Sequence, residues 1–181
     1  TKLLAERKGF GDLLADGSKK AADKINRGHE FLITVKGSET PAHMPQVKRS
    51  LGLIYSVNPF GADHNSSEHD PAIENEFKHN VKRFETIGIH KQAKKYSLNK
   101  DKVHFALKSQ HMNSFLDSAN LCVFVWGPSW QLFSPNDCVQ LVKTITNWND
   151  FTADEMLLVG ERRLNMLRAF NSREGIGKES D

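Results

Sequence analysis

The sequence predicts a mainly α-helical fold of several irregularly connected helices, with at most one short strand or hairpin near residues 31–36. Apolar residues recur at intervals of three, four and seven along several stretches, which marks the buried face of a helix. Helix-start signals precede two of these stretches, namely Ser134-Pro135 and Thr152 three residues before Glu155. Only one segment is short, β-branched and followed by glycine, as is typical of a strand.

Length and composition limit the class of protein. A chain of 181 residues with 38% hydrophobic residues is long enough for one ordinary domain, or for pieces of two, with a buried core. The net charge of +3 comes from interspersed charges, so nothing indicates a nucleic-acid partner. The basic string at 91–95 is either a solvated loop or a docking patch for an acidic electron-transfer protein.

The cysteine content and the absence of long apolar segments indicate the cellular compartment that we expect for this protein. Two cysteines, Cys122 and Cys138, form no disulfide framework, which fits a reducing compartment and favours the cytoplasm. No apolar run approaches the roughly 18 residues of a membrane span, and no signal peptide opens the sequence. The sequence begins without methionine inside a plausible helix, so we expect a piece of a longer polypeptide.

The first forty residues predict one helix and one strand. Apolar residues from Phe10 to Ile25 form a helical stripe, and Gly28 is the expected stop. The predicted strand covers 31–35. Prolines then hold Glu39 and His43 on a loop, where two ligands do not make a metal site and a surface pair is expected.

An apolar stretch at 51–57 is broken by Asn58-Pro59, and the loop after it ends in Gly-Ala-Asp-His at 61–64. An imidazole after such a turn can steady charge or carry a proton, although a lone surface histidine is the ordinary alternative. Asp70-Pro71 predicts the N-cap and first position of the next helix. The spacing of the nearby acidic and histidine residues does not favour zinc.

The next helix, from about Asp101, runs into the string Asp-Ser-Ala-Asn-Leu-Cys at 117–122. A carboxylate that accepts N–H donors and a thiolate that ligates soft metals, five residues apart where a helix stops, suggest a ligand-facing turn. The alternative is that Cys122 is a small buried hydrophobe. Two further helices are expected, the first starting at Ser134-Pro135 and the second after Thr152. The residues predicted to share the buried face of the first are Cys138, Leu141, Val142, Ile145 and Trp148.

Four strings carry a family resemblance in the same order along the chain. They are Gly-Phe-Gly-Asp-Leu-Leu at 9–14, Gly-Ala-Asp-His at 61–64, Asp-to-Cys at 117–122 and Phe-Asn-Ser-Arg-Glu-Gly at 170–175. Together they resemble the C-terminal portion, domains 2 and 3, of the tungsten-containing aldehyde:ferredoxin oxidoreductases. On that resemblance, residues 1–40 end the middle helical domain and 41–181 form the C-terminal helical domain.

The resemblance implies a bis-pyranopterin centre of tungsten or molybdenum that oxidises a small aldehyde to a carboxylate. It implies that Asp117 and Leu121 contact a pterin and that Cys122 is the last of four thiolate ligands of a 4Fe–4S cluster. It places His64 beside the metal centre as an active-site residue. It also implies that ferredoxin or a similar carrier takes the electrons, that the rest of the polypeptide is a partner, and that the full protein can form a homodimer.

The sequence departs from the family pattern at three points. Asn120 stands where the family usually has glycine, and polar residues at 65–67 stand where a basic residue often follows the histidine. The C-x2-C-x3-C run of the other cluster ligands is absent from these residues, so the chain alone is expected to be inactive and free of cofactor. Two alternatives stay open: a related tungsten enzyme that reduces aromatic thioesters, and a noncatalytic helical interaction module.

Overall fold

The computed structural model describes residues 1–74 and 77–177, and these are mainly helical. A 3-10 turn (His29–Phe31) precedes an antiparallel hairpin of β1 (Thr34–Val35) and β2 (Ser38–Glu39). The expectation of at most one short strand or hairpin near residues 31–36 is confirmed for the described residues, but the strand predicted at 31–35 is limited to Thr34–Val35, because Phe31 lies in the 3-10 turn. The helices are α1 (Lys2–Ala5), α2 (Phe10–Leu14), α3 (Ser18–Ile25), α4 (Arg49–Val57), α5 (Asp70–Glu74), α6 (Phe77–Thr86), α7 (Lys100–Ser118), α8 (Pro135–Thr146) and α9 (Ala153–Arg173).

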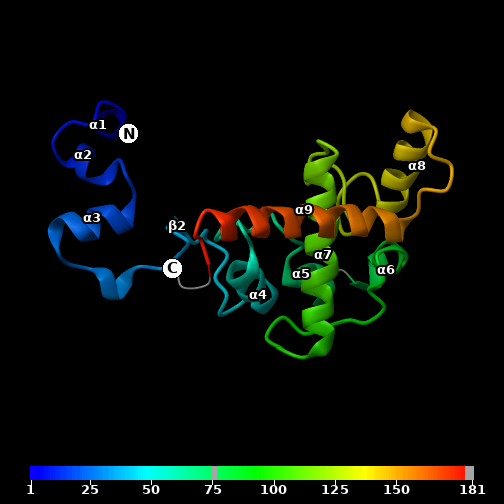
Figure 1. The fold of residues 1–181 in the computed structure, drawn as a ribbon. Helices are drawn as coiled ribbons and strands as arrows, with labels where there is room; N and C mark the ends of the chain where they lie inside the picture. The colour runs from blue at the N-terminus through cyan, green and yellow to red at the C-terminus, as the bar shows by residue number, and fades with distance from the viewer. Residues whose placement is uncertain (75–76, 178–181) are drawn as a thin grey trace.

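Helices α7 and α9 cross at the centre of the fold, with α4, α5, α6 and α8 around them (Figure 1). The crossing is close at Gly160 of α9, where an added Cβ would lie 1.9 Å from the carbonyl oxygen of His111 on α7. Ser114 Oγ donates a hydrogen bond of 2.9 Å to the Gly160 carbonyl at the same place. Glycine is therefore needed at 160 because only a residue without a side chain lets the two backbones approach so closely.

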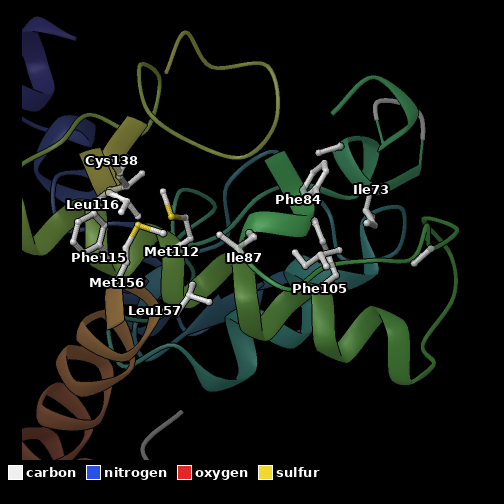
Figure 2. Packing of buried hydrophobic residues seen from close by; sticks show 14 of the residues in the cluster. Ile73, Phe84, Ile87, Phe105, Met112, Phe115, Leu116, Cys138, Met156 and Leu157 are labelled. Atoms are coloured by element: carbon white, nitrogen blue, oxygen red, sulfur yellow. The ribbon is translucent and has the colours of Figure 1, made fainter. Parts of the chain in front are cut away.

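The main hydrophobic core lies where α6, α7, α8 and α9 meet (Figure 2). Phe105 and Met112 of α7 are fully buried there, and removing each such side chain from water stabilises the fold by roughly 1.5–3 kcal/mol. The predicted core position of Cys138 is confirmed, and burial raises the pKa of its thiol to about 12. The rest of the predicted α8 face is wrong in part, because Ile145 is 72% exposed and Trp148 lies beyond the helix end.

Asp70 caps a helix, but not the one that the sequence predicts. Its carboxylate accepts hydrogen bonds from the backbone N–H of Ser50 at 3.0 Å and from Ser50 Oγ at 2.5 Å, in the first turn of α4. It also pairs with the ammonium of Lys102 near the start of α7, and both side chains are completely buried. Asp70 therefore fastens α4, α5 and α7 together, since its charge is compensated only if all three are in place.

The helix predicted from Phe10 to Ile25 is two helices, because Gly17 adopts a φ of 90° between α2 and α3. Its apolar stripe is buried only in part among the described residues: Ala21 is buried, but Phe10 is 68% exposed and Ile25 is 52% exposed. Figure 1 shows α1 to α3 set to one side of the other helices.

Candidate functional site

The string 117–122 forms the end of α7 and the turn after it. The N–H of Leu121 donates to the Leu116 carbonyl at 2.8 Å and that of Asn120 to the Asp117 carbonyl at 3.4 Å, which is the bonding pattern of a Schellman motif. Asn120 has a φ of 57°, in the left-handed region that glycine and asparagine tolerate best. The asparagine that replaces the usual glycine therefore keeps the left-handed turn.

The two residues after Asn120 face different surroundings. Leu121 is partly buried and packs against the hydrophobic core, whereas Cys122 is exposed and forms no disulfide. The alternative that Cys122 is a small buried hydrophobe is therefore wrong. The Cys122 carbonyl accepts the N–H groups of Val125 and Trp126 at 2.9 and 3.0 Å, which closes the next turn and leaves the thiol accessible.

Asp117 lies at the edge of a hollow of about 380 Å³ between the end of α7, α9 and the loop after α4. Its Oδ2 is 3.1 Å from Nη1 of Arg163 on α9. Partial burial raises the pKa of the Asp117 carboxyl, and the Arg163 guanidinium opposes that rise. Asn171 of the Phe-Asn-Ser-Arg-Glu-Gly string also lines the hollow, and its Nδ2 donates to the Pro59 carbonyl at 2.8 Å.

His64 lies in a second, smaller hollow of about 110 Å³. The loop that carries it is tied to α7, because Asn113 Nδ2 donates to the Asn65 carbonyl at 2.9 Å. Val123 and Phe124, which directly follow Cys122, line the same hollow. The structure thus brings the segment after the cysteine to the predicted histidine. His64 and Asp117 do not share a hollow, but one loop reaches both, because His64 and Asn65 line the first and Asp63 and Ser66 line the second.

Two further histidines, His43 and His69, line the His64 hollow. The position of His43 shows that one prediction from the sequence is wrong. The expected surface pair of Glu39 and His43 does not form: Glu39 Oε1 accepts the Ser18 N–H at 2.6 Å. The His43 ring instead lies 4.7 Å from the His64 ring and 4.6 Å from the His69 ring, centroid to centroid. The two prolines that flank His43 indicate a fixed loop, but no local pattern shows which surface that loop covers.

Lys48 holds these histidines in position. Its Nζ lies 2.8 Å from Nδ1 of His43 and 3.1 Å from Nδ1 of His69, so both nitrogens are acceptors. The other nitrogen of His69, Nε2, donates to the His64 carbonyl at 2.9 Å. Burial, with the Lys48 charge adding to it, lowers the pKa of His69 to about 4, and the pKa of His43 is lowered for the same reasons. Both rings are therefore neutral at pH 7.

The side chains that could bind a metal in this chain fit a cofactor whose other ligands come from outside it, and not one that this chain holds alone. Within residues 1–74 and 77–177, no group of three or more His, Cys, Asp or Glu side chains is arranged to hold a metal ion. Cys122 is the accessible thiol and Cys138 is enclosed in the core. A cluster needs four thiolates or equivalent ligands, so Cys122 fits as one ligand of a site completed by other residues.

None of the helices in the described part of the chain combines the length and the apolar character needed to cross a bilayer.

The helical fold, the accessible Cys122 thiol and the histidine-lined hollow belong to a chain that matches one enzyme family. Residues 1–181 match the family described as aldehyde ferredoxin oxidoreductase, domains 2 and 3, and the chain belongs to this family of oxidoreductases. It is similar to the tungsten-containing aldehyde ferredoxin oxidoreductases of Pyrococcus horikoshii, at 30% identity over 174 residues, and Pyrococcus furiosus, at 31% over 180. These alignments cover 96% and 98% of this chain but only 26% of each relative, so the chain spans about a quarter of their length.

Proposed function

We propose that this chain is the C-terminal part of an oxidoreductase with a tungsten or molybdenum bis-pyranopterin and a 4Fe–4S cluster, which oxidises small aldehydes to carboxylates. The observation that carries the proposal is the turn after α7, which exposes the Cys122 thiol five residues after Asp117, while residues 123 and 124 line the His64 hollow. The short segment 122–124 thus links the proposed cluster ligand, Cys122, to the hollow that contains His64.

In this proposal Asp117 accepts hydrogen bonds from N–H groups of a pterin, because an ionised carboxylate is purely an acceptor. Leu121 supplies apolar contact to the same pterin from its partly buried position. Cys122 supplies one thiolate to the cluster. When bound, the metal–pterin group and the cluster supply the redox chemistry, while the protein binds and orients them.

His64 acts at the aldehyde. A ring N–H aimed at the carbonyl oxygen would stabilise the negative charge that develops there as the carbonyl carbon is attacked. The His64 ring lies 4.7 Å from the His43 ring and 5.9 Å from the His69 ring, centroid to centroid, and Lys48 hydrogen-bonds to both of these neighbours. The hollow is narrow and partly lined by the apolar side chains of Val123 and Phe124, which favours a small substrate and limits water.

The remaining parts of the proposal concern what surrounds this chain. Residues 1–40 would belong to the middle helical domain and 41–181 to the C-terminal helical domain of the whole enzyme. The rest of the polypeptide would supply the other cluster thiolates and cover the pterins. Ferredoxin or a similar carrier would accept the electrons in the cytoplasm, and the whole enzyme would form a homodimer.

The decisive test replaces Cys122 by alanine in the full-length protein and measures iron, acid-labile sulfide and the electron paramagnetic resonance spectrum after reduction. We expect C122A to lose most of the cluster, because its fourth thiolate is gone. The matched control is C138A, which removes a thiol enclosed in the core and should keep the cluster spectrum while lowering stability. A full complement of iron with an unchanged spectrum in C122A would refute the proposal.

The chain of 181 residues gives a second test. Anaerobic reconstitution with iron and sulfide should yield no stable cluster, because one accessible thiol cannot hold it. A stable cluster at stoichiometric yield, seen in the visible spectrum, would contradict this expectation.

A further inference from the structure

Glu68 is a buried carboxyl that the proposed function leaves without a role. It is 4% exposed and lines the hollow that also contains His43, His64 and His69. Glutamate is almost never fully buried unless it is paired. Among residues 1–74 and 77–177, no salt bridge joins Glu68 to a cation. A carboxyl in such a place needs a reason other than the stability of the fold.

The hydrogen-bond network around Glu68 has a defined direction. Gln131 Oε1 accepts the Ser129 N–H at 2.9 Å, so the amide of Gln131 must present its Nε2 donor to Glu68 Oε1, 2.6 Å away. The loop that carries Gln131 is held by Arg83 of α6, whose Nη2 donates to the carbonyls of Gln131 and Phe133, each at 2.8 Å. Gln131 is therefore fixed as a donor to this carboxyl.

The Gln131 amide, the His69 backbone N–H and the charge of Arg83 do not fully compensate a buried negative charge on Glu68. Burial raises the pKa of Glu68 from its ordinary value of 4.5 to about 7, against the opposing effects of Gln131, the His69 backbone N–H and Arg83. The titratable groups that line the hollow together with Glu68 are His43, His64 and His69, and the charge of Arg83 also acts on Glu68. Since His43 and His69 are neutral at pH 7, they add no positive charge that would keep Glu68 ionised.

We propose that Glu68 is a proton acceptor in the His64 hollow, which takes up a proton released as an aldehyde and water become a carboxylate. This inference rests on the proposed function. The overall conversion of one aldehyde and one water to a carboxylate releases two electrons and three protons. When bound, the metal–pterin group would take the two electrons, and the ferredoxin-type carrier would receive them in turn. Glu68 accepts one of the three protons on a carboxylate oxygen and returns it to solvent after the product leaves, and the other two protons go to solvent.

Glu68 differs from the other acidic side chains near the two hollows in the partners that its carboxyl contacts. Asp63 hydrogen-bonds to Ser66, and Asp117 is paired with Arg163, so both are already engaged with partners of their own. Glu68 has a single side-chain donor and shares its hollow with the histidine that is proposed to act on the carbonyl. A group that is close to both of its protonation states at neutral pH transfers protons most efficiently.

The test uses the full-length holoenzyme and reads the protonated-carboxyl C=O band by infrared spectroscopy as pH is raised from 5 to 9. We expect a band that disappears around neutral pH, that is absent from E68Q, and that is unchanged in E85Q, a control in which an exposed glutamate loses the same charge. In Q131M the band should persist to higher pH, because the donor that favours the ionised form is lost. A spectrum of E68Q identical to that of the parent would overturn the proposal.

The pH profile of kcat/KM for an aldehyde, with a ferredoxin-type dye as acceptor, is the second measurement. E68Q should lower kcat/KM by about 10²-fold or more and lose the ionisation near neutral pH, whereas E85Q should keep both. An unchanged profile in E68Q beside an active parent enzyme overturns only the role of Glu68. A parent holoenzyme that oxidises no aldehyde overturns the proposed function itself, and this role with it.

Discussion

Arg163 of α9 holds Asp117 of α7 from the neighbouring helix, with Nη1 3.1 Å from Oδ2 of the carboxylate. The same Nη1 donates to Ser114 Oγ at 3.3 Å, one turn earlier on α7. Ser114 Oγ in turn donates to the Gly160 carbonyl where the helices cross. The carboxylate proposed to bind a pterin is thus positioned by the packing of two helices, and Arg163 is its positioning residue.

Replacing Arg163 by methionine should loosen Asp117 with little effect on stability. The two side chains are 36% and 50% exposed, and pairs with that much solvent contribute about 1 kcal/mol or less. We expect R163M to unfold at nearly the parent's urea concentration but to hold less pterin and metal per full-length chain. Arg162 is the matched control, because it is exposed and pairs with Glu155 at 3.0 Å. Equal cofactor loss in R162M would show that position 163 has no particular role.

Asn120 should respond to substitution according to its left-handed backbone. A residue with a branched or plain Cβ is strained at a φ of 57°, so N120A should lower stability by about 1 kcal/mol and N120G should leave it equal or higher. Urea unfolding measures both. Asn147, with a φ of 56° at the end of α8, is the control, because N147A should cost similar stability. In the full-length protein, cluster content should fall in N120A and not in N147A.

The buried pair of Asp70 and Lys102 should be essential to the fold. Removing Lys102 leaves the Asp70 charge in a dry interior, which costs about 3–5 kcal/mol in comparable cases. K102M should therefore unfold at a much lower urea concentration or fail to accumulate as folded protein. K100M, in the same turn of α7 but exposed, should be nearly neutral. A loss below about 1 kcal/mol in K102M would mean that Asp70 is compensated by Ser50 alone.

Glu68 and His69 should impose opposite pH dependences on stability. The pKa of Glu68 is raised from 4.5 to about 7, so the folded state holds a proton that the unfolded state has released, and stability falls as pH rises through that window. The pKa of His69 is lowered from 6.5 to about 4, so the unfolded state takes up a proton first as pH falls, and stability falls with it. The two effects nearly cancel between pH 4.5 and 6.5.

Single substitutions should separate these two effects. As pH is raised from 5 to 7.5, the free energy of unfolding of E68Q should rise relative to that of the parent, and that of H69Q should fall. Each change should be about 2 kcal/mol, if each pKa unit is worth about 1.4 kcal/mol. The free energy of unfolding in urea at the two pH values measures the change. Parallel pH profiles for the parent and both variants would contradict the two shifted ionisations.

The sequence alone was enough for the features that depend on neighbouring residues. Helical periodicity and the caps at Ser134 and Thr152 predicted α8 and α9, and the structure shows both caps. The Asp-to-Cys string predicted the turn after α7, because the end of a helix is decided by a few adjacent residues. The family resemblance also depended on short strings in a fixed order, and the match over residues 1–181 confirms it.

Only the tertiary structure decided which side chains meet. His43 and Glu68 join His64 because three loops and the start of α4 converge, and no local pattern encodes that convergence. Asp70 looked like the cap of its own helix but caps α4, since a carboxylate bonds to whichever donors the packing brings near. The reason is physical: periodicity and capping act within a few residues, whereas burial, charge pairing and pKa depend on segments that folding brings together from distant parts of the chain.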